Sequence, residues 1–96
     1  MANEKNEEKM KEVQITATEE IKRGVFANQA IVSHTPDEFV MDFIYLSPAG
    51  GTLNSRVIVT PSHFKRLIKA MAENLTKYEE KFGEISEKKQ EQPLNG

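Results

Sequence analysis

Residues 60–83 read TPSHFKRLIKAMAENLTKYEEKFG and carry the signals of one long amphipathic helix. Thr60 is placed as an N-cap that accepts backbone N–H bonds, and Pro61 suits the first helical position because its missing N–H has no intrahelical partner there. Gly83 follows Phe82, as a C-terminal glycine does. The sequence therefore predicts a helix over 61–82.

The apolar residues of this helix fall on one stripe, recurring at intervals of four and three residues, with Leu67 widening the stripe near its start. The stripe consists of Phe64, Ile68, Met71, Leu75, Tyr78 and Phe82. A helix of ~22 residues is ~33 Å long, whereas a strand of typical length spans ~20 Å. We therefore expect the second half of the helix to extend beyond its own sheet.

This overhang predicts a homodimer. Leaving Leu75, Tyr78 and Phe82 in water would forgo roughly 1.5–3 kcal/mol apiece in a domain with a modest core. A two-fold partner would cover them by pairing the helices or by laying each helix across the partner's sheet. The predicted interface residues are Met71, Leu75, Tyr78 and Phe82. The alternative is a monomer whose helix crosses its own sheet diagonally and packs fully against it.

The chain before the helix is rich in β-forming residues and turn signals. It predicts four strands, at 13–18, from 24 or 25 to 33, at 38–46 and at 52–59, with turns at 34–37 and 47–51. We therefore expect an α+β fold, a four-stranded antiparallel meander followed by one long C-terminal amphipathic helix (ββββα). Residues 13–83 would form this single domain, between disordered tails at 1–12 and 84–96 that lack apolar content.

The two later hairpins can be paired on paper. Pairing Ser33 with Glu38 and Leu46 with Thr52 gives both hairpins one shared apolar face. That face would hold Phe26, Ala30, Val32, Phe39, Met41, Tyr45, Leu53, Val57 and Val59. On the mixed opposite face, the same register sets Asp42 directly across from Arg56.

Asp42 allows two interpretations, since it is the acid in the middle of a strongly apolar strand. It is either a pocket carboxylate with a raised pKa or one half of a cross-strand ion pair with Arg56. We favour the ion pair, because an arginine already stands at the required position.

Little else in the sequence indicates catalysis. His34 and His63 have no metal-binding spacing, and without cysteine there is neither a zinc thiolate site nor a disulfide. Motifs for a catalytic serine or for phosphate binding are also missing. We expect no enzyme activity, no cofactor, no metal site and no catalytic residue.

Composition points to a cytoplasmic protein. Apolar residues make up 38% and charged residues 29%, and the sequence has no apolar run that would form a signal peptide or cross a membrane. The net charge of −2 comes from the ends, because eight basic and eight acidic residues balance within 13–83. Any nucleic-acid binding would therefore need a local basic patch.

Such a patch supports an alternative function, a dimeric single-stranded DNA- or RNA-binding protein. Its candidate residues are Arg23, Arg56, Lys65, Arg66 and Lys69. The predicted topology also resembles single-stranded nucleic-acid-binding dimers of the transcriptional-coactivator, whirly and purine-rich-element-binding types. Against this, the aromatic residues that would stack on bases are assigned to the core face. They are Phe26, Phe39, Phe43 and Tyr45.

Several short clusters lie along 13–85: FAN at 26–28, VSH at 32–34, P-x-E-F at 36–39, DF at 42–43 and SRV at 55–57. T-P-x-H at 60–63, KRL at 65–67, Asn74 and Y-E-x-x-F-G at 78–83 follow. Together they resemble a family of small bacterial and archaeal proteins of unknown function (domain of unknown function 3467). The resemblance implies no activity. Asn74, on the helix flank, either hydrogen-bonds a partner chain or a strand edge or faces water.

From these observations we expect a non-enzymatic cytosolic interaction module. It would form a homodimer through its C-terminal helix and contact another protein through its mixed sheet face or its tails. Nucleic-acid binding is the alternative, and no membrane partner is expected.

Overall fold

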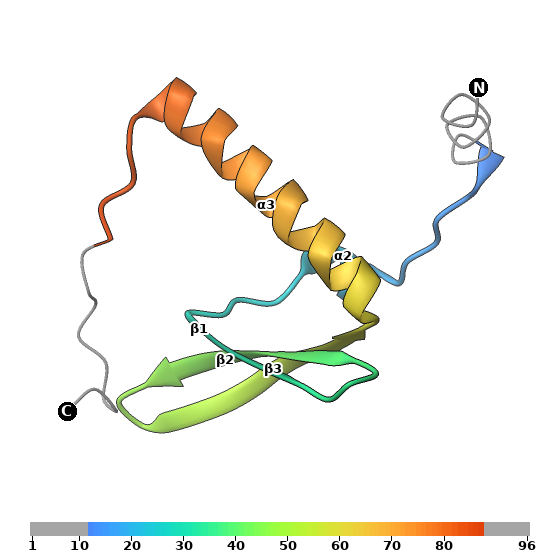
Figure 1. Cartoon of the computed structure of the whole chain (residues 1–96). Coiled ribbons are helices and arrows are strands. Elements are labelled where there is room, and N and C mark those ends of the chain that lie inside the picture. The colour runs from blue at the N-terminus through green and yellow to red at the C-terminus, as the bar shows by residue number, and fades with distance from the viewer. Residues whose placement is uncertain (1–11, 88–96) are drawn as a thin grey trace.

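A computed structural model describes residues 12–87 of the chain, which form one sheet and two helices (Figure 1). The elements follow in the order α2 (Glu19–Arg23), β1 (Gln29–His34), β2 (Phe39–Ser47), β3 (Gly50–Val59) and α3 (Pro61–Phe82). The three strands form one antiparallel sheet in the order β1-β2-β3. The α+β class is as predicted, but the four-stranded meander is wrong.

The missing strand is the one predicted at 13–18, which pairs with no strand within the described part of the chain. Val13 and Ile15 are both exposed, and Figure 1 shows this segment leading away from the sheet. Apolar alternation defines two faces for a strand, but a strand also needs a neighbouring edge for its backbone hydrogen bonds. Residues 13–18 have the alternation but pair with neither edge strand of the described sheet, β1 or β3.

The short helix α2 occupies part of the region read as an irregular break between strands. Thr18 caps it, because its Oγ1 accepts a hydrogen bond from the Ile21 backbone N–H at 3.1 Å. Acidic residues stand in its first turn and basic residues in its last, and Gly24 ends it at a φ of 76°. The strand predicted at 24–33 is therefore shortened to Gln29–His34.

Between β2 and β3 the register agrees with the prediction from the Phe39–Val59 pair to the Phe43–Ser55 pair. Met41 pairs with Val57 and Asp42 pairs with Arg56. An irregularity between Phe43 and Ile44 then moves Leu53 opposite Ile44 instead of Tyr45. A one-residue shift of this kind places Leu53 on the opposite face from the one predicted.

Both hairpins close differently from the prediction. His34 pairs with Phe39, so the first hairpin is shifted by two residues, which leaves every side chain on its predicted face. Ser47 pairs with Gly50, so the second hairpin has a two-residue loop in place of the expected five-residue turn. Gly50 has a φ of 130°, a conformation that other residues rarely adopt.

The helix α3 has the predicted bounds and the predicted ends. Thr60 Oγ1 accepts from the His63 backbone N–H at 3.2 Å, and the Gly83 N–H donates to the Glu79 carbonyl at 2.9 Å. Its first turns meet the sheet, where the Phe64 ring stacks on the Phe39 ring with centroids 4.1 Å apart. Beyond its first turns the helix diverges from the sheet at an angle (Figure 1).

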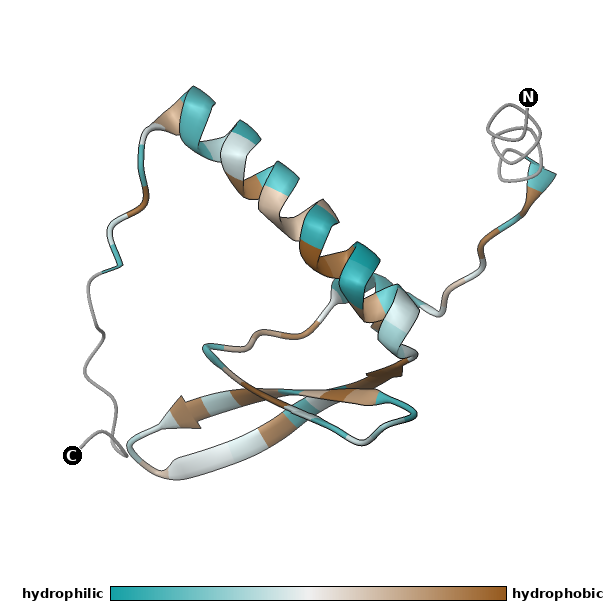
Figure 2. Ribbon diagram, in the orientation of Figure 1, coloured by the Kyte–Doolittle hydropathy of each residue, from teal (hydrophilic) through white to brown (hydrophobic). Residues whose placement is uncertain are grey.

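The second half of α3 is uncovered, as expected, but not because the helix is longer than the strands. β2 contains 9 residues and β3 contains 10, so at ~3.3 Å per residue the strands are ~30 Å long and nearly match the helix. The second half of α3 is exposed because it turns away from the sheet. Figure 2 shows hydrophobic residues along the side of α3 that is turned toward the sheet.

The described part of the chain has almost no buried core. Among the described residues only Met41 is buried, with 7% of its surface exposed. Of the two predicted disordered tails, at 1–12 and 84–96, residues 1–11 and 88–96 lie outside the described residues.

Candidate interaction surface

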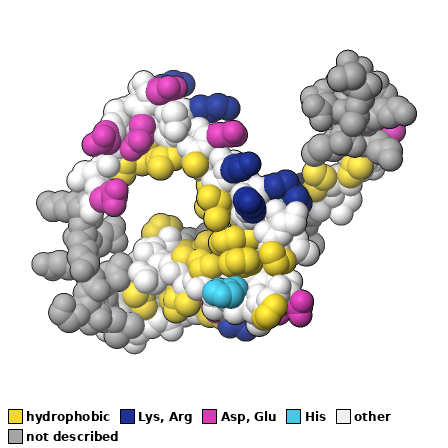
Figure 3. Space-filling view, viewed as in Figure 1, with side chains coloured by type: hydrophobic (Ala, Val, Ile, Leu, Met, Phe, Trp, Pro, Cys, Tyr) yellow, Lys and Arg dark blue, Asp and Glu magenta, His cyan; other side chains and the backbone are white. Residues whose placement is uncertain are grey.

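The main surface feature is an open apolar cleft between α3 and the sheet, visible in Figure 3 as two hydrophobic walls that face each other. One wall is the second half of the α3 stripe. Its residues keep large exposed fractions: Met71 58%, Leu75 48%, Tyr78 47% and Phe82 65%. A shallow hollow on this wall is lined by Ala70, Met71, Asn74, Leu75 and Tyr78. The structure therefore places all four predicted interface residues on one exposed surface.

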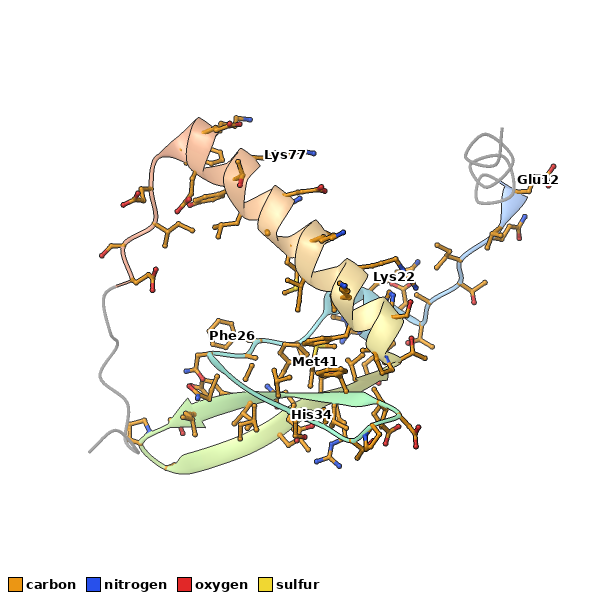
Figure 4. All side chains as sticks on the ribbon, in the orientation of Figure 1. Glu12, Lys22, Phe26, His34, Met41 and Lys77 are labelled. Atoms are coloured by element: carbon orange, nitrogen blue, oxygen red, sulfur yellow. The ribbon has the colours of Figure 1, made fainter. Side chains whose placement is uncertain are left out.

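The other wall is the face of the sheet that α3 overlooks. Phe39 defines this face, because it stacks on Phe64, and Met41 lies on the same side two residues along β2. Val32 and Val57, the pairing partners of Met41, are half exposed on either side of it. Figure 4 shows Met41 and Phe26 on the side of the sheet toward α3.

Phe26 and Tyr45 form the far part of this wall. Their rings meet edge to face with centroids 5.8 Å apart, and they are 67% and 42% exposed. The sequence assigned both to the core. Hydrophobic patterning identified the correct face of the sheet but contained no signal that α3 would leave this end uncovered.

Two asparagines hold the segment that carries Phe26. The Asn28 side chain donates to the Leu46 carbonyl at 3.1 Å and accepts from the Leu46 N–H at 2.9 Å. Asn54, at the sheet irregularity, donates from Nδ2 to the Phe26 carbonyl at 2.6 Å. These bonds hold residues 26–28, which precede β1, against the sheet. The apolar wall therefore extends past the residues of β1 that pair with β2.

An aromatic column stands where the cleft closes. The His34 ring lies 5.4 Å from the Phe39 ring, which stacks in turn on Phe64 at 4.1 Å between centroids. This column joins β1, β2 and α3, and so fixes the angle at which the helix leaves the sheet. His34 lies against the Phe39 ring there, and His63 stands in the first turn of α3.

The opposite face of the sheet carries the predicted pair of Asp42 and Arg56. Arg56 donates from Nε to Asp42 Oδ1 at 2.7 Å and from its second nitrogen to Asp42 Oδ2 at 2.9 Å, a two-pronged geometry. The hydrogen bond from Arg56, together with its positive charge, lowers the pKa of Asp42 below its ordinary value of 3.8, although partial desolvation opposes the shift. The carboxylate therefore has a structural partner.

This shift gives a pH-dependent prediction. A carboxyl group whose pKa is lower in the folded than in the unfolded state stabilises the fold above the unfolded pKa, and the stabilisation is lost as the pH falls through the folded value. We expect Asp42→Asn to lower the free energy of unfolding at about pH 7. The difference from wild type should shrink below pH 3.8. Urea titrations across this range measure it, with Asp37→Asn, in an exposed turn, as the control. An equal difference at every pH would contradict the assignment.

The residues proposed for nucleic-acid binding are not brought together as one site. Lys65, Arg66 and Lys69 stand on the side of α3 away from the stripe, and Arg66 bonds the Ser62 hydroxyl at 2.7 Å. The Arg56 guanidinium is engaged with Asp42 on the outer sheet face. Arg23 lines a separate hollow beside α2. Figure 3 does show lysine and arginine side chains gathered over the first turns of α3.

Metal-binding clusters and membrane-spanning helices were both sought within residues 12–87. No group of three or more histidine, aspartate or glutamate side chains there is arranged to hold a metal ion. In the same range, neither helix combines the length and apolar character needed to span a membrane.

Comparison with known proteins identifies the family. No curated protein and no solved structure matches the chain significantly. The family model described as "Protein of unknown function (DUF3467)" matches residues 1–87. The chain therefore belongs to this family.

Proposed function

We propose that this protein is a non-enzymatic interaction module that assembles as a homodimer through the C-terminal half of α3. One observation carries the proposal: the apolar stripe from Met71 to Phe82 is exposed in a protomer whose only buried residue within 12–87 is Met41. A stable small domain buries several large apolar side chains, because burial of each contributes roughly 1.5–3 kcal/mol against the entropy of folding. A second chain supplies the burial that one chain lacks.

The outer face of the sheet is the surface that we propose for another protein. Ile31 and Ile58 are about half exposed there, beside the Asp42–Arg56 pair. The apolar side chains provide contact area for a partner protein, and the charged pair among them can orient that partner. We propose a cytosolic location, since a fold without cysteine needs no oxidising compartment.

Sedimentation equilibrium tests the dimer directly. We expect a mass twice the 10.9 kDa of the chain at micromolar concentration. The thermal unfolding midpoint should also rise with protein concentration, because dissociation and unfolding are coupled when protomers share their core. A mass of one chain, with a midpoint independent of concentration, would rule the dimer out.

Single-stranded nucleic-acid binding is the second candidate, and one finding favours it more than the sequence did. Phe26 and Tyr45 are exposed, so an aromatic surface exists on which a base could stack. Fluorescence anisotropy with a labelled oligonucleotide at low salt tests this function, comparing wild type with Lys65→Gln/Lys69→Gln. Binding that weakens in the variant and with added salt would support it, and no binding at low salt would exclude it.

A further inference from the structure

We infer that the dimer is interlocked, with the C-terminal half of α3 from each protomer seated in the cleft between α3 and the sheet of the other. The inference rests on the proposed homodimer and adds the location of the helix. Each stripe would cover the partner's sheet wall, which is defined by Val32, Met41, Val57, Tyr45 and Phe26. A dimer made by pairing helices alone would leave that wall in water.

The connection between β3 and α3 is the first argument, because it prevents the helix from covering its own sheet. β3 ends at Val59 and α3 begins at Pro61, so Thr60 alone joins them. Thr60 is extended, with φ −70° and ψ 156°, and its side chain caps the helix. The ring of Pro61 fixes its own φ and favours extended backbone at Thr60 before it, and the Phe39–Phe64 stack holds the first turn. This junction leaves no slack through which the far half of α3 can swing down onto Tyr45 and Phe26.

The fit of the helix to the cleft is the second argument. At ~1.5 Å per residue the half of α3 from Met71 to Phe82 is ~18 Å long, so it fits within the ~30 Å of β2 at ~3.3 Å per residue. The charged residues Glu73, Lys77 and Glu80 stand on the opposite side of the helix from the stripe, since successive residues turn by ~100°. In Figure 4, Lys77 points away from the cleft. Ala70 and Asn74, small residues beside the stripe, line the hollow where a second helix can approach closely.

The exposed area is the third argument. A large aromatic side chain has ~150–250 Å² of surface, and on that scale the exposed fractions of the two walls amount to roughly 900 Å² per protomer. A stable interface of standard size buries ~800 Å² on each partner. The residues counted are Phe26, Val32, Tyr45, Val57, Ile68, Met71, Leu75, Tyr78 and Phe82. Covering one wall alone would fall well short of that area.

The nature of the walls favours a second copy over a different protein. In a two-fold dimer the same surface serves as insert and receptor, and this chain carries both an apolar helix and an apolar wall of similar length. The wall residues and the stripe residues are uncharged, so neither wall offers a charge that would select a foreign partner.

Photo-crosslinking between isotopically distinct chains tests the arrangement. Tyr78→p-benzoylphenylalanine replaces one aromatic residue of the stripe by a photoreactive one. The variant protein is labelled with ¹⁵N, mixed with unlabelled wild type, unfolded and refolded so that mixed dimers form. The mixture is then irradiated, and the crosslinked peptides are identified by mass spectrometry. We expect products that join position 78 of the heavy chain to light-chain peptides of the sheet wall, around Phe26, Tyr45 or Val57. Lys77→p-benzoylphenylalanine, on the outer side of α3, is the control and should give at least tenfold less of these products.

The same probe at Phe82 gives a second position, so that the test does not depend on one variant. Each protein is first required to sediment with the wild-type mass. Crosslinks from the stripe to the partner's α3 alone, or no interchain product with the sheet wall, would overturn the interlocked arrangement while leaving the dimer intact. Crosslinks to the sheet wall of the same chain would show that α3 closes onto its own sheet. A monomeric wild type would overturn the proposed function as well.

Discussion

Leu75→Ser/Tyr78→Ser is expected to dissociate the dimer. Both side chains are about half exposed in the protomer, 48% and 47%, so a partner would add roughly half of the 1.5–3 kcal/mol that full burial provides. A two-fold interface contains each residue twice. The combined loss is about 3–6 kcal/mol, which corresponds to a roughly 10²- to 10⁴-fold increase in the dimer Kd. Sedimentation over a dilution series measures the change.

The control for this experiment is Glu73→Ser/Lys77→Ser, on the opposite side of the same helix. It changes the same number of residues to serine and so has a similar effect on helix propensity. It should leave the Kd within a few-fold of wild type. Because the protomer buries only Met41 within the described range, the dissociated stripe variant should also lose helical circular dichroism at low concentration. An unchanged mass in the stripe variant would count against α3 as the interface.

The helix shows how far local sequence signals determine structure here. Its cap at Thr60, its proline at position 61 and its terminal glycine each act within one turn, so the predicted bounds match those observed. The same kind of signal existed at α2, where Thr18 precedes two glutamates, but the pattern was read as a break between strands. A cap motif of that type could have revealed the short helix.

The strands show what local sequence signals cannot predict, namely which strands pair and in which register. Alternation at 13–18 is genuine, yet pairing depends on whether a sheet edge lies within reach, which no local pattern encodes. The irregularity at Phe43/Ile44 involves Asn54, whose amide bonds the Phe26 carbonyl, 28 residues away in the sequence. A contact of that range could not be predicted from the neighbours of Asn54.

The sequence predicted the residues of both walls of the candidate surface but not how the walls lie relative to each other. Periodicity identified the stripe from Met71 to Phe82, and pairing identified the apolar face with Phe26 and Tyr45. The stripe was expected to overhang the sheet and to be covered by a partner, whereas Phe26 and Tyr45 were assigned to a core face. The angle at Thr60 separates the two walls, and that angle comes from a one-residue junction and the Phe39–Phe64 stack. The face of an element can be read from its sequence, whereas the surface that covers it depends on tertiary geometry.

Asn28→Ala is expected to give the largest loss of stability from a single polar side chain. Asn28 pairs its backbone N–H with the Ile44 carbonyl at 3.0 Å, and its amide makes both hydrogen bonds to Leu46. The Asn28 side chain thus makes the two hydrogen bonds to Leu46 that the backbone of a paired strand residue would otherwise make. Alanine would leave the N–H and the carbonyl of Leu46, a half-buried residue, without these partners. The expected cost is ~1–3 kcal/mol in the free energy of unfolding.

Urea unfolding at a fixed protein concentration measures this loss, with the dependence on denaturant compared between variants to exclude a changed unfolded state. Gln29→Ala, at the adjacent exposed position, is the control and should change stability by less than ~0.5 kcal/mol. Asn28→Asp separates the two bonds, because a carboxylate still accepts from the Leu46 N–H but faces the Leu46 carbonyl without a donor. It should therefore be destabilised as well. If Asn28→Ala proves as mild as Gln29→Ala, Asn28 does not hold the wall segment, and Phe26 must be positioned by Asn54 and Tyr45 alone.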